Sequence, residues 1–165
     1  MKKILTLAIV LFLGLNLMAQ DNDKAQGLEL KTEEDYKKME PVILRGIDWL
    51  QETPVAESKK ERKEISGLLM LWMSGTPSVS IAIVEGLVPM GNPDCMIAFM
   101  CGWTKYSLDN NYSKDNLKCA KAAVEHTIEF YNKNKKDIGK SKDVENLIKK
   151  QKKGTLEKYI KSKYP

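Results

Sequence analysis

The chain is 165 residues long, with 42% hydrophobic and 30% charged residues and a formal net charge of +5. This composition supplies enough apolar side chains to bury a core, which excludes a chain that is disordered throughout. The length suits one domain and is too short for two domains of ordinary size.

The first nineteen residues have the pattern of an export signal. Lys2 and Lys3 form a positive start, residues 4–17 are almost wholly apolar, and Ala19 precedes the expected cleavage point at Gln20. These features predict a secretory signal peptide, and the apolar run is short for a membrane span. No cysteine stands at the cleavage point, which disfavours a lipid anchor. We therefore expect a periplasmic or secreted protein.

A helical domain is predicted to follow a flexible leader, because residues 20–31 are polar and lack periodicity. From Thr32, a good helix cap, apolar residues recur at three- and four-residue steps as far as Leu50. Pro41 interrupts this pattern and predicts either a kink or a new helix that begins there. A second helix is predicted over 57–73, with a charged first half and an apolar second half.

Residues 78–84 alternate small polar and branched side chains, which is typical of a strand. No second segment of this quality occurs in the sequence, and a single strand leaves its backbone hydrogen-bonding groups unpaired. Two interpretations remain: residues 78–90 form an extended segment that crosses the domain, or they form an edge that pairs with another chain. We favour the crossing segment.

Asn92 and Pro93 begin the clearest predicted helix, as a cap followed by a proline in the first turn. This helix runs to about Leu108, and its apolar residues cover more than half of its circumference, so we expect it to be the central buried helix. Ala98 and Gly102 lie one turn apart, and their small size allows a neighbouring helix to approach closely.

Three further helices are predicted in the C-terminal part of the chain. Ser113 caps the first, which runs to about residue 134, and the others cover roughly residues 141–151 and 155–163. The whole pattern predicts an all-α fold. We expect a single-domain bundle of five or six helices over 32–165, with the one extended segment described above.

Lysine is concentrated near the C-terminus. Residues 132–165 contain twelve lysines and four acidic residues, a net charge of +8, whereas residues 20–131 carry a net charge of −5. Such a lysine-rich part either binds anionic lipid, lipopolysaccharide or an acidic protein, or consists of solvated helix faces beside the acidic body. We favour the solvated faces. The expected export, the lack of arginine in this part and the lack of a recognised motif exclude nucleic acid as a partner.

Three cysteines, Cys95, Cys101 and Cys119, follow the signal, and the expected compartment permits a disulfide. Cys95 and Cys101 would lie about 9 Å apart along one helix, too far to bridge. A disulfide between Cys101 and Cys119, across a helical hairpin, is one alternative. We nevertheless favour three free, buried thiols.

His126 is the only histidine. It is either a general base oriented by Glu129, in a small hydrolase, or a half-buried residue on an amphipathic helix. Cys119 precedes it by two helical turns, about 10 Å, which is too far for direct proton transfer. We favour the half-buried residue. The sequence has no metal-binding or cofactor-binding motif, so neither a metal nor a cofactor is predicted.

Methionine and aromatic residues are concentrated in the middle of the chain. Such a set lines an apolar pocket or an adaptable groove for a protein partner, although core packing is the commoner outcome. The candidate binding residues are Trp72, Met73, Met96, Met100, Trp103 and Tyr106. We expect a non-enzymatic periplasmic or secreted protein that binds a protein or an apolar small ligand. The alternatives are the hydrolase and an envelope-associated scaffold that binds anionic surfaces through its lysine-rich part.

The segments 72–77 (WMSGTP) and 98–106 (AFMCGWTKY) resemble small exported helical proteins of Gram-negative bacteria that have no assigned activity. The resemblance rests on apolar positions after the signal, and it implies a helical fold without supplying a catalytic residue. The chain is also similar to periplasmic immunity proteins, which are small, exported and helical and bind a secreted toxin. Their paired-cysteine pattern is not matched here.

Overall fold

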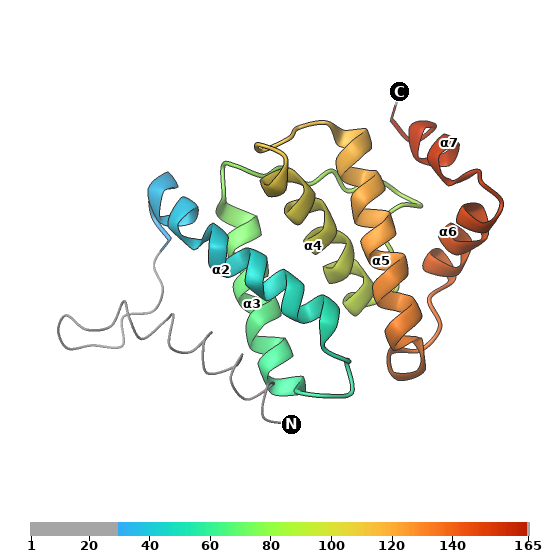
Figure 1. Ribbon diagram of the computed structural model, residues 1–165, viewed down its shortest axis with the longest axis horizontal. Coiled ribbons are helices and arrows are strands. Elements are labelled where there is room, and N and C mark those ends of the chain that lie inside the picture. The colour runs from blue at the N-terminus through green and yellow to red at the C-terminus, as the bar shows by residue number, and fades with distance from the viewer. Residues whose placement is uncertain (1–29, 165) are drawn as a thin grey trace. The chain divides into compact units, whose positions relative to one another are not determined.

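Six α-helices make up the part of the chain that the computed structural model describes, residues 30–164 (Figure 1). They are α2 (Glu33–Glu52), α3 (Lys59–Gly75), α4 (Pro93–Asp109), α5 (Asn116–Ile138), α6 (Lys142–Lys152) and α7 (Leu156–Lys161). No strand occurs among these residues, so the predicted all-α bundle is confirmed. None of the described helices is long and apolar enough to cross a lipid bilayer. The predicted signal peptide and nearly all of the predicted leader lie outside the described residues.

The first of these helices, α2, begins where the sequence predicts. The Thr32 hydroxyl accepts a hydrogen bond from the Asp35 N–H at 3.2 Å, and the Asp35 carboxylate accepts one from the Thr32 N–H at 2.9 Å, which completes a capping box. Pro41 lies inside α2, and the helix continues through it, so the alternative of a separate helix that begins there is wrong. Ile43 and Ile47 are fully buried just beyond the proline. Their packing offsets the missing backbone donor.

The apolar second half of α3 packs against α2. Trp72 is fully buried, its indole N–H donates to the Tyr36 carbonyl at 2.9 Å, and the centroids of the two aromatic rings lie 6.5 Å apart. Leu69, one turn before Trp72, is buried as well. The apolar pattern of the sequence therefore identifies the face of α3 that enters the core.

The central pair of helices is α4 and α5, which lie side by side (Figure 1). The Asn92 side chain caps α4 by accepting a hydrogen bond from the Cys95 N–H at 3.0 Å, and Trp103 is buried in the middle of the helix. Gly102 faces α5 so closely that a Cβ there would lie 2.6 Å from the Cβ of His126. Both predictions for this helix, its burial and the close approach of a neighbour, are confirmed.

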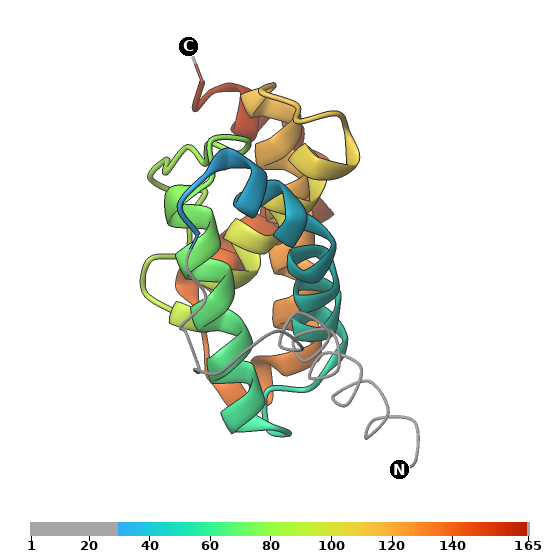
Figure 2. The same cartoon turned by 90° about the vertical axis from the view of Figure 1, so that its left-hand side faces the viewer.

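The segment between α3 and α4, residues 76–92, contains no strand. It crosses behind α4 and α5 in Figure 1, and in Figure 2 it lies on the same side of the bundle as α3. Val79 and Leu87 are buried, and the Gly86 carbonyl accepts a hydrogen bond from the Tyr159 hydroxyl at 3.3 Å. The predicted path across the domain is therefore confirmed.

The start of α5 differs from the prediction by two residues. Its N-cap is Asp115, whose carboxylate accepts hydrogen bonds from the N–H groups of Leu117 and Lys118, each at 3.1 Å, so the predicted cap Ser113 is wrong. The Ser113 N–H instead donates to the Ser107 carbonyl at 3.1 Å and closes the turn after α4.

The two C-terminal helices, α6 and α7, pack on α5 through small apolar faces. Leu147 and Ile160 are buried there. Tyr131 joins α5 to α6, because its hydroxyl donates to the Glu145 carboxylate at 2.9 Å and accepts from the Ser141 N–H at 3.3 Å. The apolar residues of these two short helices therefore belong to the core of the bundle.

Candidate functional site

The six candidate residues of the methionine and aromatic cluster divide into core and surface positions. Trp72 and Trp103 are enclosed in the bundle. Met73, Met96, Met100 and Tyr106 are half-buried. None of the six lines either of the two hollows described below. A partner could therefore contact the four half-buried candidates but not the two enclosed tryptophans.

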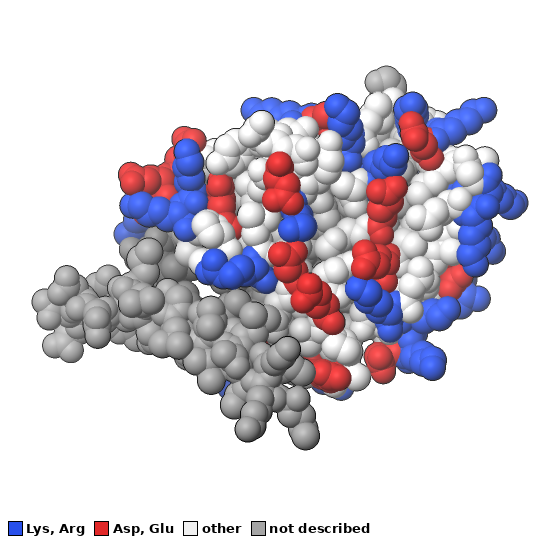
Figure 3. Space-filling model, in the orientation of Figure 1, with Lys and Arg blue, Asp and Glu red and all other residues white. Residues whose placement is uncertain are grey.

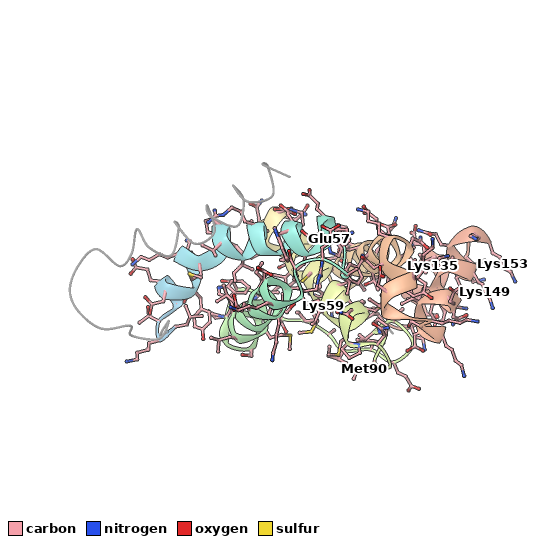
Figure 4. All side chains as sticks on the ribbon, turned by 90° about the horizontal axis from the view of Figure 1, so that it is seen from below. Glu57, Lys59, Met90, Lys135, Lys149 and Lys153 are labelled. Atoms are coloured by element: carbon pink, nitrogen blue, oxygen red, sulfur yellow. The ribbon has the colours of Figure 1, made fainter. Side chains whose placement is uncertain are left out.

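Exposed large hydrophobic side chains are concentrated between positions 70 and 90 of the sequence. The described part of the chain exposes five large hydrophobic side chains, and four of them lie in this stretch: Met70 (37% exposed), Leu71 (52%), Ile83 (58%) and Met90 (63%). We call these four residues the apolar strip. Figure 4 shows Met90 projecting from the edge of the bundle.

None of the four residues of the apolar strip is among the six candidates named from the sequence, and Leu71 and Ile83 are neither methionine nor aromatic. A signal for the first does exist, because residues 68–73 form an unbroken apolar run. A helix with one buried face cannot enclose every side chain of such a run. The exposure of Ile83 depends on how segment 76–92 crosses the bundle, which the local sequence does not determine.

The backbone of residues 79–83 is unpaired. Within the part of the chain that the structure describes, none of its N–H groups donates and none of its carbonyls accepts a hydrogen bond. The flanking groups are engaged: the Ser78 N–H donates to Thr76 Oγ1 at 3.2 Å, and the Val84 carbonyl accepts from the Leu87 N–H at 3.1 Å. Unpaired backbone with strand-like side chains is what an added strand of another chain binds.

A cavity of about 10 Å³ with a mixed polar and apolar lining lies between α2, α3, α4 and α5. Its polar lining includes Gln51, Arg62, Asp94 and His126. A cavity of this size accommodates one water molecule and no larger ligand. The cavity therefore has no room for an organic substrate.

Arg62 reaches this cavity from α3 and closes the C-terminal end of α2. Only 8% of its surface is exposed, and its Nη2 donates to the carbonyl oxygens of Leu50, at 3.2 Å, and of Thr53. Its guanidinium carbon lies 5.7 Å from the Trp49 ring and 5.9 Å from the Phe130 ring. A cation at the C-terminal end of a helix satisfies the last carbonyls and interacts favourably with the helix dipole. This geometry gives Arg62 a structural role.

His126 is half-buried beside the same cavity. Burial lowers its pKa from the ordinary value of 6.5 to about 4, so the ring is neutral at pH 7. The partner expected from the sequence, Glu129, is exposed and forms an ion pair with Lys133 at 2.8 Å, which holds the pKa of that carboxyl below its usual value. The carboxylate that was expected to orient the histidine therefore pairs with a lysine.

All three cysteines are free and buried, as predicted. Burial raises the pKa of Cys95 and of Cys101 to about 12, and it also raises the pKa of Cys119. The Cys119 thiol donates to the Ser113 carbonyl at 3.5 Å. A thiol whose pKa is raised by burial is a poor nucleophile, so these cysteines lend nothing to the catalytic interpretation.

Most lysines of the C-terminal part are not paired. Two of the twelve form ion pairs: Lys133 with Glu129 at 2.8 Å and Lys161 with Glu157 at 3.0 Å. The other ten, which are all lysines from 135 to 163 except Lys161, have no carboxylate within 4.0 Å among the described residues. We call these ten lysines the basic end.

The basic end forms one side of the helical bundle. In Figure 3 lysine side chains line the right-hand side, where acidic side chains are few. Figure 4 shows Lys135, Lys149 and Lys153 projecting from that same end, whereas Lys59 lies away from it. Most of these side chains are exposed.

A second hollow, of about 300 Å³, lies between the start of α5 and α7. Its lining includes Leu117, Lys118, Lys121, Ile160 and Lys161. Each of these lysines is paired with a carboxylate, that of Asp115 or that of Glu157, at distances of 3.0 to 3.6 Å. The charges of this hollow are therefore largely neutralised by neighbouring residues of the chain.

Two surfaces remain as candidate binding sites: the apolar strip with the unpaired backbone beside it, and the basic end. In residues 30–164 no group of three or more histidine, cysteine or acidic side chains is placed to hold a metal ion. No protein-family model, curated protein or solved structure matches the chain.

Proposed function

We propose that this chain is a non-enzymatic binding protein, periplasmic or secreted, that holds a protein partner against its apolar strip. One observation carries the proposal: four of the five exposed large hydrophobic side chains and the unpaired backbone of residues 79–83 fall on the same stretch of chain. An exposed apolar surface marks an interaction site, and an unpaired edge specifies how a polypeptide attaches to it.

The partner segment that suits this surface is extended and uncharged. Residues 76–84 contain no charged residue, so a charged segment would lose its hydration there without gaining a counter-charge. A strand added beside residues 79–83 would satisfy their N–H and carbonyl groups and would pack its side chains on Ile83. Strand edges that proteins keep unpaired usually carry lysine or proline, and residues 78–84 have neither.

A small apolar ligand suits the geometry less well. Trp72 and Trp103 are enclosed, and the cavity beside the central helices has a volume of about 10 Å³. Ligand pockets usually measure about 300–1,000 Å³. The hollow of about 300 Å³ lies at α5 and α7, and none of the methionine and aromatic candidates lines it.

The hydrolase alternative gains no support from the site. His126 borders a cavity with room for one water molecule, its expected partner Glu129 is paired with Lys133, and the three thiols are buried. A general base needs a substrate within hydrogen-bond reach, and this cavity leaves no space for one.

Crosslinking in the native cell envelope, followed by affinity recovery and mass spectrometry, tests the proposal when variants are compared. Ile83→Lys and Met90→Lys each place a charge on the apolar strip. Tyr112→Lys is the matched control, because Tyr112 is the exposed large hydrophobic residue outside the strip. We expect the wild type and the Tyr112 variant to recover the same partner and both strip variants to lose it. Equal recovery by all variants, or no partner for the wild type, contradicts the proposal.

Backbone pairing is tested separately at Ala82. Ala82→Pro removes one N–H donor from the unpaired stretch, whereas Ala82→Ser keeps this donor and changes the side chain only slightly. We expect the Ala82→Pro variant to lose the partner and the Ala82→Ser variant to retain it. Recovery that is unchanged by proline overturns the added strand and leaves side-chain docking alone.

A further inference from the structure

We infer that the basic end is a docking site for the phosphate-bearing surface of an anionic lipid bilayer. The inference is independent of the partner proposed for the apolar strip, because it rests on different residues at a different part of the bundle. Its starting point is a group of ten lysines, most of them exposed, that have no carboxylate partner among the described residues.

The lysines of the basic end outnumber the carboxylates left unpaired in the same part of the chain. Of the four acidic residues in 132–165, Glu145 accepts a hydrogen bond from the Tyr131 hydroxyl, and Glu157 is paired with Lys121 and Lys161. Glu145 keeps its charge in that hydrogen bond, so Asp137, Asp143 and Glu145 remain to offset the ten lysines of the basic end. A solvated helix face usually mixes both signs of charge in similar numbers, whereas here ten lysines face three carboxylates.

The packing of the helices directs these lysines outward together. The apolar residues of α6, Val144, Leu147 and Ile148, are buried against the bundle, which leaves its lysines on the outer face. Lys149 and Lys153 lie one turn apart on this face, and Lys135 belongs to the last turn of α5, the helix on which α6 packs. Two packed helices therefore both contribute cationic groups to the basic end.

Tyr159 holds two further members of the basic end in place. The ammonium nitrogens of Lys150 and Lys163 lie 4.0 Å and 5.3 Å from the centroid of its ring. Such cation–π contacts reduce the freedom of these side chains without neutralising their charge. The charge of α6 and that of the C-terminal residues are thereby kept together.

The form of the basic end suits a broad surface better than a small anion. None of its ten lysines lines either of the two hollows described above, so neither hollow would hold a free phosphate against them. Lysine is a compact point charge that binds phosphate without the two-point geometry of arginine, and residues 132–165 contain no arginine. Many separate ammonium groups on an outward-facing surface match a bilayer with many separate headgroup phosphates.

A nucleic acid is less well matched to this surface. Single strands stack their bases on exposed aromatic rings, and Tyr159, the ring between two of these lysines, is only half-exposed. The one aromatic residue among the exposed large hydrophobic side chains of the described residues, Tyr112, lies outside residues 132–165. Sequence-specific contacts to a duplex usually involve arginine, which this part lacks.

The rest of the domain would orient the protein at such a bilayer. Residues 30–131 contain twelve basic and fifteen acidic residues, a net charge of −3, against +8 for residues 132–165. An anionic surface attracts the second part and repels the first. The protein would therefore approach the bilayer with α6 and the end of α5 in front.

Vesicle binding tests the inference on the protein purified from the cells that produce it. Vesicles of phosphatidylcholine mixed with phosphatidylglycerol are compared with vesicles of phosphatidylcholine alone, and binding is measured by co-sedimentation. The test variant is Lys149→Gln with Lys153→Gln. The control is Lys59→Gln with Lys63→Gln, which removes the same charge from exposed positions on α3. Thermal unfolding verifies that all forms are folded.

We expect binding to the anionic vesicles, with an affinity at least tenfold higher than for neutral vesicles. Loss of two lysines at the membrane surface should weaken binding by roughly 25-fold, because each contributes about fivefold. The α3 control should match the wild type. Raising the salt from about 0.1 M to about 1 M should abolish binding, since the Debye length falls from ~10 Å to ~3 Å.

Three results would overturn the inference. The first is no binding to anionic vesicles at low salt. The second is an equal loss of affinity in both double variants, which would show a dependence on net charge and not on the basic end. The third is tighter binding to duplex DNA than to the vesicles at the same salt, which would identify a different polyanion.

Discussion

Gly102 and His126 pack against each other across the interface of α4 and α5. A Cβ at position 102 would lie 2.6 Å from the Cβ of His126 and 2.9 Å from the Cα of Ala123. Because these atoms belong to or adjoin the α5 backbone, they cannot move aside cheaply. Gly102→Ala is therefore expected to lower the free energy of unfolding by about 1–3 kcal/mol, measured by urea denaturation.

Gly67 supplies the matched control for this substitution. It lies inside α3, is exposed, and a Cβ there would meet no atom within 4 Å. Gly67→Ala should leave the stability unchanged or raise it by up to about 1 kcal/mol, the helix preference of alanine over glycine. Equal effects of the two substitutions would contradict the close packing of α4 on α5.

Arg62 is expected to stabilise the fold through the C-terminal end of α2. Arg62→Met keeps much of the buried stem but removes the donors to the carbonyls of Leu50 and Thr53. We expect the free energy of unfolding to fall by about 2–3 kcal/mol, the usual value for hydrogen bonds to a charged group. Arg45→Met, at an exposed position, should change it by less than about 0.5 kcal/mol. Similar losses for both variants would argue against the capping role.

His126 should make the stability depend on pH in a defined window. The unfolded chain takes up a proton near pH 6.5, whereas the folded protein resists protonation until the pH approaches about 4. The folded state is therefore favoured above pH 6.5, and this contribution is lost progressively as the pH falls towards 4. Between pH 7.5 and 5 the wild type should lose about 2 kcal/mol more than His126→Gln, in paired urea titrations. Parallel pH dependences for the two proteins would show that the histidine is not buried.

The three thiols should be unreactive in the folded protein. Cys95, Cys101 and Cys119 are buried, and the pKa of each is raised by burial. A thiol reagent such as dithionitrobenzoate should label them slowly at pH 8 and should label all three at once after denaturation. Fewer than three reactive groups in denaturant, without added reductant, would reveal a disulfide.

The sequence predicts best the features that depend on neighbours along the chain. Thr32 begins α2 and Asn92 begins α4 because the capping side chain and its backbone partner are three residues apart. The start of α5 was misplaced because Ser113 and Asp115 are both good caps. The choice between them depends on the turn closed by the Ser113 N–H on Ser107.

Features that depend on distant contacts could not be predicted from the sequence. Arg62 lies in a charged run, 57–64, that is typical of a solvated face, and only the tertiary fold places it against the end of α2. The same limit applies to the lysines, since their number is plain in the sequence but their lack of carboxylate partners is not. Tryptophan is typical both of binding grooves and of cores, so the sequence could not assign the candidate binding residues Trp72 and Trp103 to either. The packing encloses both.

Hydrogen exchange at the backbone amides of residues 79–83 tests the central claim most directly. In the free protein these amides should exchange rapidly, because they donate no hydrogen bond within the described chain. Addition of the partner recovered by crosslinking should slow their exchange and leave the exchange of the α6 amides unchanged. If their exchange slows at a high concentration of this protein alone, the partner is a second copy of the chain. Rapid exchange at residues 79–83 in the complex, with protection elsewhere, would contradict partner binding by an added strand.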